Sequence, residues 1–148
     1  QLVFDARFHD SERLIGGLAP AMLDHRELNA VAEAIQRSVQ ASEALQRYAL
    51  ALWRATAEPA AFGVQLSGVD TDTLMLAGAS PRGMSLLLRA ARTAAWLAGR
   101  GHVTPEDVQS VFVETIAHRL CFQPVYEMRR HEISPQLMSA IVGKVAAP

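Results

Sequence analysis

The sequence contains one cysteine, one lysine and no long apolar run, and each shortage excludes a class of protein. Cys121 has no second cysteine to pair with, so no disulfide forms within the chain, which fits a reducing compartment. Apolar stretches such as 48–53 and 94–98 are far shorter than the roughly 18 residues that cross a bilayer. We therefore expect a cytoplasmic protein without a membrane span.

The chain also lacks an excess of either charge. Its 14 lysine and arginine residues balance 15 aspartate and glutamate residues, for a formal net charge of −1. General binding to nucleic acid relies on many basic contacts to phosphates, so this function is disfavoured, although a local basic stripe remains possible. Half of the 148 residues are hydrophobic, which is enough for one core, and a chain of this length typically forms one domain.

The motifs of common catalytic and metal sites are missing. Lys144 has no hydroxyl residue after it and lies in no Gly-x-x-x-x-Gly-Lys-Ser/Thr sequence, so this chain cannot form a P-loop. The five histidines never fall at ligand spacing with one another or with Cys121. The segment 78–82 lacks the second glycine of a nucleophile elbow. We expect no catalytic residue and no metal site in this chain, and an unrecognised small enzyme is the least favoured interpretation.

Three pairs of a hydroxyl residue and proline predict helix starts, because the hydroxyl caps free N–H groups and proline suits the first helical position. They are Ser80-Pro81, Thr104-Pro105 and Ser134-Pro135. Apolar residues at spacings of three and four then predict helices over 81–98, from 105 onward and over 135–145. In the second of these, Asp107 stands at the capping-box position.

Two more helices are predicted in the first half. One follows a cap at Asp24 and has an apolar stripe from Leu28 to Val39, and the other begins after Ser42 and stops before Pro59. Residues 59–79 are rich in glycine and aspartate and predict a long loop with at most short strands. The fold class that follows is all-α, a small helical bundle with one long loop, and 122–132 is expected to be irregular.

Arg82 is the strongest local candidate for a binding residue. It is the second residue of the helix predicted to begin at Pro81. A helix N-terminus favours anions, and a guanidinium there is well placed to pair with a phosphate. By itself, however, this pattern more often marks a solvated arginine. Arg82, Arg89 and Arg92 also share one helix face, which could contact a neighbouring subunit or an acidic partner, although a solvated face is the commoner explanation.

Other single residues have structural explanations. Cys121, next to Phe122, is expected to be a small buried residue without a histidine partner. Trp53 and Trp96 lie off the main apolar stripes, so they mark either an interface or packing against neighbouring elements. Residues 118–119 end a helix, where positive side chains complement the helix dipole.

Several segments together resemble the C-terminal lid of MoxR-type AAA+ ATPases. They are GASPR at 78–82, LLLRAAR at 86–92, GR at 99–100, VTPEDV at 103–108, HRL at 118–120 and, upstream, SVQASEAL at 38–45 and RAT at 54–56. The resemblance implies a helical lid beside a P-loop core, with ATP and Mg²⁺ held mainly by that core. It makes Arg82 the sensor-2 arginine, supported by the helix start at Ser80 and Pro81. Whether Arg82 acts on its own subunit's nucleotide or on a neighbour's stays open.

The resemblance also implies a division of the chain. Residues 1–22 would be a connector from a nucleotide-binding core, 23–121 the lid, and 122–148 an extension with a terminal helix. Because residue 1 is glutamine, we expect a piece of a longer chain, and the weak alternation over 1–7 suggests the end of a strand from the core.

The parent protein would then be an ATP-hydrolysing, chaperone-like machine, while this part alone would not hydrolyse ATP. The resemblance implies a hexamer whose protein client, in some cases, carries a von Willebrand A-type domain. An alternative from a different class is a stand-alone helical interaction module, of histone-like character, that binds protein or nucleic acid through the arginine stripe. Salt-dependent binding to DNA would distinguish the two.

Overall fold

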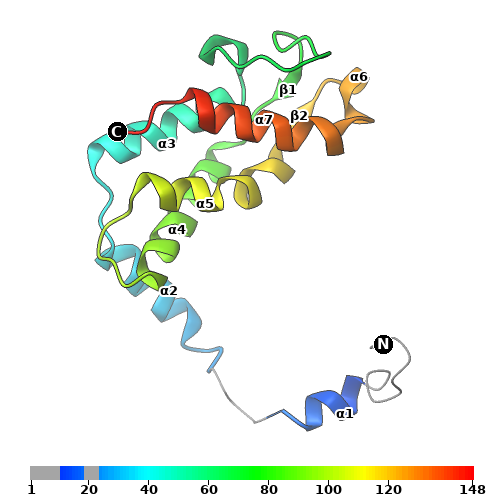
Figure 1. Ribbon diagram of the computed structural model, residues 1–148. Coiled ribbons are helices and arrows are strands. Elements are labelled where there is room, and N and C mark those ends of the chain that lie inside the picture. The colour runs from blue at the N-terminus through cyan, green and yellow to red at the C-terminus, as the bar shows by residue number, and fades with distance from the viewer. Residues whose placement is uncertain (1–10, 19–23) are drawn as a thin grey trace. The chain divides into compact units, whose positions relative to one another are not determined.

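The computed structural model describes residues 11–18 and 24–148, which form seven α-helices, two short 3₁₀ turns and one two-stranded sheet (Figure 1). The chain divides into two units, 1–31 and 32–148. Helix α1 (Ser11–Gly16) lies in the first unit, and the strand end predicted for 1–7 falls outside the described residues. The boundary after residue 22 stays a prediction.

Helix α2 (Leu28–Ser38) begins later than its predicted cap. Oδ1 of Asp24 accepts a hydrogen bond from the N–H of Arg26 at 2.9 Å, so this side chain stabilises a turn that precedes the helix. Of the predicted apolar stripe, Ile35 and Val39 are buried, whereas Leu28 is 53% exposed. The C-terminal end of α2 is therefore the part that enters the core of the second unit.

Three helices form the centre of the second unit, and the sequence predicted all of them. They are α3 (Glu43–Ala55), α4 (Pro81–Leu97) and α5 (Pro105–Ile116). The most extensive contact joins α4 to α5, and helix α7 (Arg130–Lys144) packs against α3 and α5 (Figure 1). The all-α prediction is confirmed.

The predicted caps explain where these helices begin. Oγ of Ser42 accepts a hydrogen bond from the N–H of Leu45 at 3.2 Å, and this bond satisfies one of the free N–H groups in the first turn of α3. At the start of α5, Thr104 and Asp107 form the predicted capping box, with Oδ2 of Asp107 accepting from the N–H of Thr104 at 2.8 Å.

The core contains the whole inner face expected for α3 and most of the faces expected for α4 and α5, whereas Ala98 at the end of the predicted α4 face is exposed. Its largest buried side chains come from several elements and include Leu45, Leu52, Leu74, Leu87, Phe112, Ile116, Leu120, Ile133, Leu137, Met138 and Ile141. The burial expected for Cys121 is wrong, because this side chain is exposed. Phe122 occupies the buried position instead, as expected from the alternation of side chains along a strand.

The long loop over 59–79 has little regular structure, as predicted. It contains the 3₁₀ turn η3 (Ala60–Phe62) and the short strand β1 (Met75–Ala77). Strand β1 pairs antiparallel with β2 (Cys121–Phe122), a partner that the sequence did not indicate. The pairing ties the end of the loop to the segment that follows α5 and the 3₁₀ turn η4 (Ala117–Arg119) (Figure 1).

The helix start predicted at Ser134-Pro135 is wrong. Helix α7 begins at Arg130, so Pro135 lies inside it, and the segment 122–132 is not irregular but includes the helix α6 (Pro124–Glu127). Packing explains the difference. Ile133 is buried four residues before the buried Leu137, so burial of one continuous apolar face favours a helix that runs through the proline.

An ion pair fixes the turn between α4 and α5. The guanidinium of Arg100 donates to both carboxylate oxygens of Asp107, at 2.5 and 2.6 Å. The Asp107 side chain is 7% exposed, so its charge needs these donors in addition to the N–H of Thr104. Hydrogen bonding to Arg100 lowers the pKa of Asp107, and it outweighs burial, which alone would raise the pKa.

We expect Asp107→Ala to lower the free energy of unfolding by about 1.5–3 kcal/mol at pH 7, because the substitution removes the carboxylate that accepts from Arg100 and from the N–H of Thr104. Glu114→Ala is the matched control: Glu114 is exposed on the same helix, and we expect a change within about 0.5 kcal/mol. Urea titration of both variants measures the difference. Equal stability of the two variants would contradict the role given to the ion pair.

The same comparison has a pH dependence. Because the pKa of Asp107 is lower in the folded protein, its carboxylate adds stability above the unfolded pKa, and this stability is lost as the pH falls through the folded pKa. The gap between the native protein and Asp107→Ala should therefore stay constant down to about pH 4, where an ordinary aspartate titrates, and shrink below it.

Candidate functional site

The first turn of α4 presents Arg82 to solvent. Ser80 is the N-cap, and its Oγ accepts a hydrogen bond from the N–H of Gly83 at 3.3 Å, while Pro81 occupies the first helical position. Arg82 follows as the second helical residue and is exposed. Among the residues that the structure describes, its side chain makes no hydrogen bond and no ion pair. The local geometry is therefore the one that the sequence predicted.

The residue before the cap is held by α3. The N–H of Ala79 donates to Oγ1 of Thr56 at 3.0 Å, and the carbonyl oxygen of Ala79 accepts from Nε1 of Trp53 at 2.6 Å. The hydroxyl of Thr56 donates in turn to the carbonyl oxygen of Trp53 at 2.6 Å. Ala79 and Thr56 are both buried, so these bonds satisfy polar groups that water does not reach. We call this set of three hydrogen bonds the Ala79 clamp.

Close packing on both sides of Ala79 adds to the clamp. A Cβ atom at Gly78 would lie 2.6 Å from the backbone nitrogen of Ala57 and 2.7 Å from Oγ1 of Thr56. A Cβ atom at Gly83 would lie 3.2 Å from Cδ of Arg119, whose Nε donates to the carbonyl oxygen of Thr115. The backbone that carries Arg82 is thus in contact with the end of α3 on one side and with η4 on the other.

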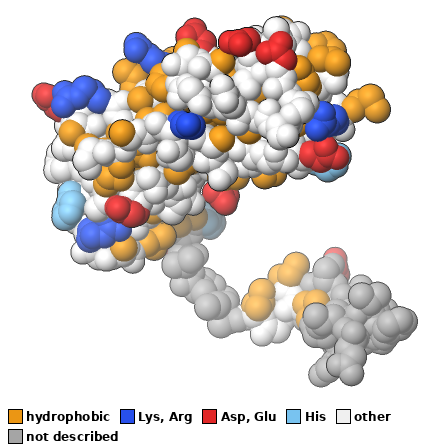
Figure 2. Space-filling model, turned by 45° about the horizontal axis from the view of Figure 1, so that its top comes forward, with side chains coloured by type: hydrophobic (Ala, Val, Ile, Leu, Met, Phe, Trp, Pro, Cys, Tyr) orange, Lys and Arg blue, Asp and Glu red, His pale blue; other side chains and the backbone are white. Residues whose placement is uncertain are grey.

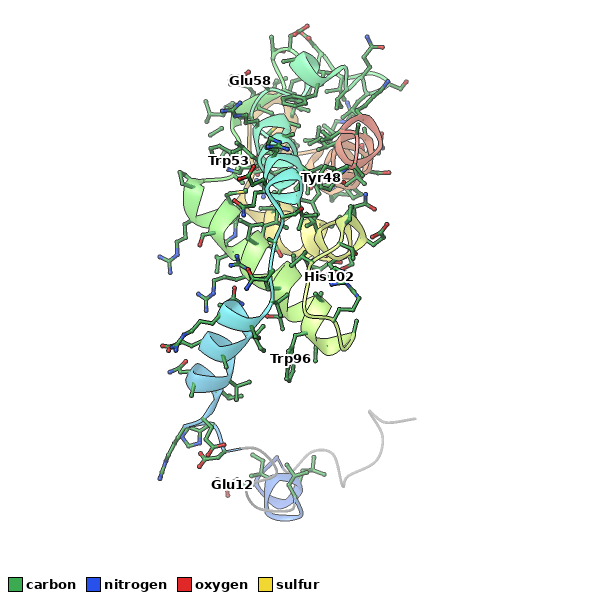
Figure 3. All side chains as sticks on the ribbon, turned by 90° about the vertical axis from the view of Figure 1, so that its left-hand side faces the viewer. Glu12, Tyr48, Trp53, Glu58, Trp96 and His102 are labelled. Atoms are coloured by element: carbon green, nitrogen blue, oxygen red, sulfur yellow. The ribbon has the colours of Figure 1, made fainter. Side chains whose placement is uncertain are left out.

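A cleft of about 450 Å³ lies beside the clamp. It is lined by residues at the C-terminal end of α3 and in the loop after it: Trp53, Arg54, Ala57, Glu58 and Phe62. Figure 3 shows Trp53 and Glu58 at the C-terminal end of α3, and Trp96 at the C-terminal end of α4. Trp53 is half-buried and has a structural hydrogen bond, whereas Trp96 is 46% exposed.

The three arginines of the predicted stripe have different surroundings. Arg89 is exposed like Arg82. Arg92 is half-buried, and its Nη1 donates to Oε1 of Gln36 at 3.5 Å, while Nε2 of Gln36 donates to the carbonyl oxygen of Arg89 at 3.3 Å. Arg92 therefore contributes to the contact between α2 and α4, and only two of the three guanidinium groups are freely presented to solvent.

The groups that the site presents are suited to an anion. The site offers an exposed guanidinium on the first turn of a long helix, where the helix dipole also favours negative charge. Within 11–18 and 24–148, no group of three or more histidine, cysteine, aspartate or glutamate residues could hold a metal ion. Over the same residues, no helix is long and apolar enough to cross a membrane.

Sequence reasoning found Arg82 and its cap but missed the Ala79 clamp. The three clamp residues are separated by up to 26 positions, and nothing in the spacing pairs them. The one available signal was Trp53, which stood off the apolar stripe of its helix while its indole N–H still required an acceptor.

Comparison with known proteins identifies similar chains. Residues 70–137 match the family described as AAA lid domain. Over 99% of its length the chain is 46% identical to a protein named MoxR from Methylorubrum extorquens and 42% identical to one from Paracoccus denitrificans. It spans 43% of the length of each of these two relatives. It is also 33% identical, over 71% of its length, to a protein named Chaperone MoxR1 from Mycobacterium tuberculosis, of which it covers 26%.

A solved structure has the same fold. The crystal structure of a candidate ATPase from Cytophaga hutchinsonii superimposes on 78% of this chain with a TM-score of 0.66 and 28% sequence identity, and the match covers 33% of that protein. The site described above therefore lies in a type of helical domain that recurs within larger proteins.

We expect Gly78→Ala to lower the free energy of unfolding by about 1–3 kcal/mol, because the added methyl group would overlap the backbone of Ala57. Gly101→Ala is the control, since a Cβ atom there meets nothing within 4 Å and should change stability by less than about 0.5 kcal/mol. Thermal unfolding of the two variants measures both effects. If both variants have the same melting temperature as the native protein, Gly78 does not pack against the end of α3 as described.

Proposed function

This chain belongs to the MoxR-type AAA+ ATPases and carries their lid domain, and from that premise we propose that it couples ATP binding and hydrolysis to remodelling of partner proteins. The single observation that supports this proposal is the exposed guanidinium of Arg82 on the capped first turn of α4. In this proposal Arg82 is the sensor-2 arginine. Ser80 and Pro81 support it by fixing the start of the helix.

The physical chemistry of arginine suits this role. A guanidinium group is permanently charged and planar, so it can form two parallel hydrogen bonds to phosphate oxygens. The γ-phosphate leaves on hydrolysis, and an arginine that binds it experiences a different charge before and after the reaction. ATP and Mg²⁺ would be held mainly by the nucleotide-binding core, outside this chain. The chain would sense the nucleotide and would not hydrolyse it alone.

Assembly and partner proteins follow from the same membership. Similarity to a protein named as a chaperone supports a machine that acts on other proteins. We propose a hexamer in which the lid contacts its own core and neighbouring subunits. We also propose that the protein acts in the cytoplasm and that its client is a protein, in some cases one with a von Willebrand A-type domain.

We expect Arg82→Ala in the full-length protein to reduce ATP turnover or ATP affinity by about 10- to 100-fold. A hydrogen bond to a charged group contributes about 1.5–3 kcal/mol, and each tenfold change corresponds to about 1.4 kcal/mol. Steady-state hydrolysis and nucleotide titration measure the two effects separately. Arg82→Lys should retain part of the activity, because lysine keeps the charge but not the planar pair of donors.

Arg89→Ala provides the matched control for this experiment. Arg89 is exposed on the same helix, so its loss removes an equal charge from the same element without touching the first turn. Its turnover should stay within about twofold of the native protein, which corresponds to a surface effect of less than about 0.5 kcal/mol. Unchanged turnover and affinity in Arg82→Ala would overturn the sensor-2 assignment.

Mixing of inactive subunits distinguishes action on the same subunit from action on a neighbour. One variant carries Arg82→Ala, and the other carries an intact Arg82 with a disabled nucleotide-binding core. If Arg82 acts on a neighbour's nucleotide, mixed rings recover turnover, because a disabled subunit can supply its arginine to an intact core. If Arg82 acts within its own subunit, mixed rings recover nothing.

The alternative of a nucleic-acid module predicts a different result. A nucleic-acid module would bind duplex DNA with an affinity that falls steeply between about 50 and 200 mM salt, because many phosphate contacts produce that dependence. We expect this chain to show no such binding. The face in Figure 2 supports this expectation, since its basic and acidic side chains are interspersed. Fluorescence anisotropy with labelled DNA measures the binding, and a steep salt dependence would favour the alternative.

A further inference from the structure

The backbone N–H and the backbone carbonyl oxygen of Ala79 are both bound by side chains at one end of α3. Thr56 takes the N–H at 3.0 Å, and Trp53 binds the carbonyl oxygen at 2.6 Å. Both side chains come from the last turn of α3 or the residue that follows it. The N–H and the carbonyl oxygen of Ala79 belong to the two peptide planes that meet at its Cα atom, so neither plane can rotate without breaking one of the two bonds.

The clamp is also internally connected. The Thr56 hydroxyl has one proton, and it is donated to the carbonyl oxygen of Trp53 at 2.6 Å. Oγ1 of Thr56 also accepts a hydrogen bond from the N–H of Ala79, so the hydroxyl is used both as donor and as acceptor. Thr56 is fully buried, and water cannot replace either bond. Loss of this hydroxyl would leave the N–H of Ala79 without a partner.

Arg82 depends on this clamp for its position. Its side chain has no partner among the described residues, so its place is set by its backbone alone. That backbone follows Ala79 by three residues, through the cap at Ser80 and the fixed φ angle of Pro81. A change in the backbone of Ala79 would therefore be carried through a rigid start of the helix to the guanidinium.

We infer that Trp53 and Thr56 are positioning residues that act through Arg82, holding the first turn of α4 at the place from which Arg82 reaches its anionic ligand. This inference rests on the sensor-2 role proposed above. Neither residue touches the nucleotide in this account. Their contribution is the orientation of a side chain that they do not contact.

The test uses the full-length protein and four variants: Thr56→Val, Arg82→Ala, the double variant and Thr56→Ser. Valine replaces the hydroxyl with a methyl group of similar size, while serine keeps the hydroxyl. Thr93→Val is the matched control, because it makes the same substitution at another hydroxyl that binds a backbone carbonyl oxygen. The Thr93 hydroxyl donates to the carbonyl oxygen of Arg89 within α4 at 3.0 Å and takes no part in the Ala79 clamp. ATP turnover and the melting temperature are measured for each.

We expect Thr56→Val to lower turnover about fivefold to tenfold when Arg82 is present, and less than twofold when position 82 is alanine, because coupled residues are not additive. Thr56→Ser should restore most of the turnover, and Thr93→Val should leave it unchanged. The melting temperature should fall by the same amount for Thr56→Val in both backgrounds. This split separates positioning of Arg82 from a general loss of stability.

Two failures are distinguishable. If Thr56→Val lowers turnover by the same factor in both backgrounds, its role is structural and the positioning inference is overturned, while the sensor-2 role stands. If Arg82→Ala alone has no effect, the proposed function fails and the inference fails with it. Should Thr56→Val not fold, Trp53→Phe provides the same comparison, because it removes the N–H that binds Ala79 and leaves a smaller aromatic ring.

Discussion

Burial of the backbone of a single residue imposes a constraint on the rest of the domain. A buried N–H or carbonyl oxygen without a partner is costly, and Ala79, which is 6% exposed, has both groups to satisfy. Helix α3 supplies both partners, so α3 and α4 must lie in one relative position. Gly78 allows this close approach, since any side chain there would overlap Thr56 and Ala57 at the end of α3. The position of α4 in turn sets that of α5, with which it shares the most extensive helix contact.

The domain combines fixed backbone with free side chains at one location. The first turn of α4 is capped by Ser80, fixed in φ by Pro81 and packed against Arg119 through Gly83. The guanidinium of Arg82 projects from that turn into solvent. At the other end of α4, Arg100 and Asp107 use their charges on each other and not on a ligand. The two arginines differ in their surroundings because Arg100 has a buried carboxylate within reach.

The sequence was sufficient where a feature is local. Hydroxyl caps, prolines and apolar spacing predicted α3, α4 and α5, the capping box at Asp107 and the exposed start at Arg82. It failed where distant residues decide. Pro135 lies within a helix because Ile133 is buried against other elements, and Cys121 is exposed because strand alternation places Phe122 inside. The Ala79 clamp could not be predicted, since hydrogen bonds between residues 23 and 26 positions apart leave no periodic trace.

Pro135 has a further consequence for the C-terminal part of the chain. A proline has no N–H, so the carbonyl oxygen of His131 receives no hydrogen bond from position 135, and α7 lacks one backbone hydrogen bond in its first half. The turn before this gap is attached instead by Arg130, which donates to the carbonyl oxygen of Leu120 and lies over the ring of Phe122. In amide exchange, the residues before Pro135 should therefore behave together with β2, as one cooperative unit, while the rest of α7 exchanges with the helical core.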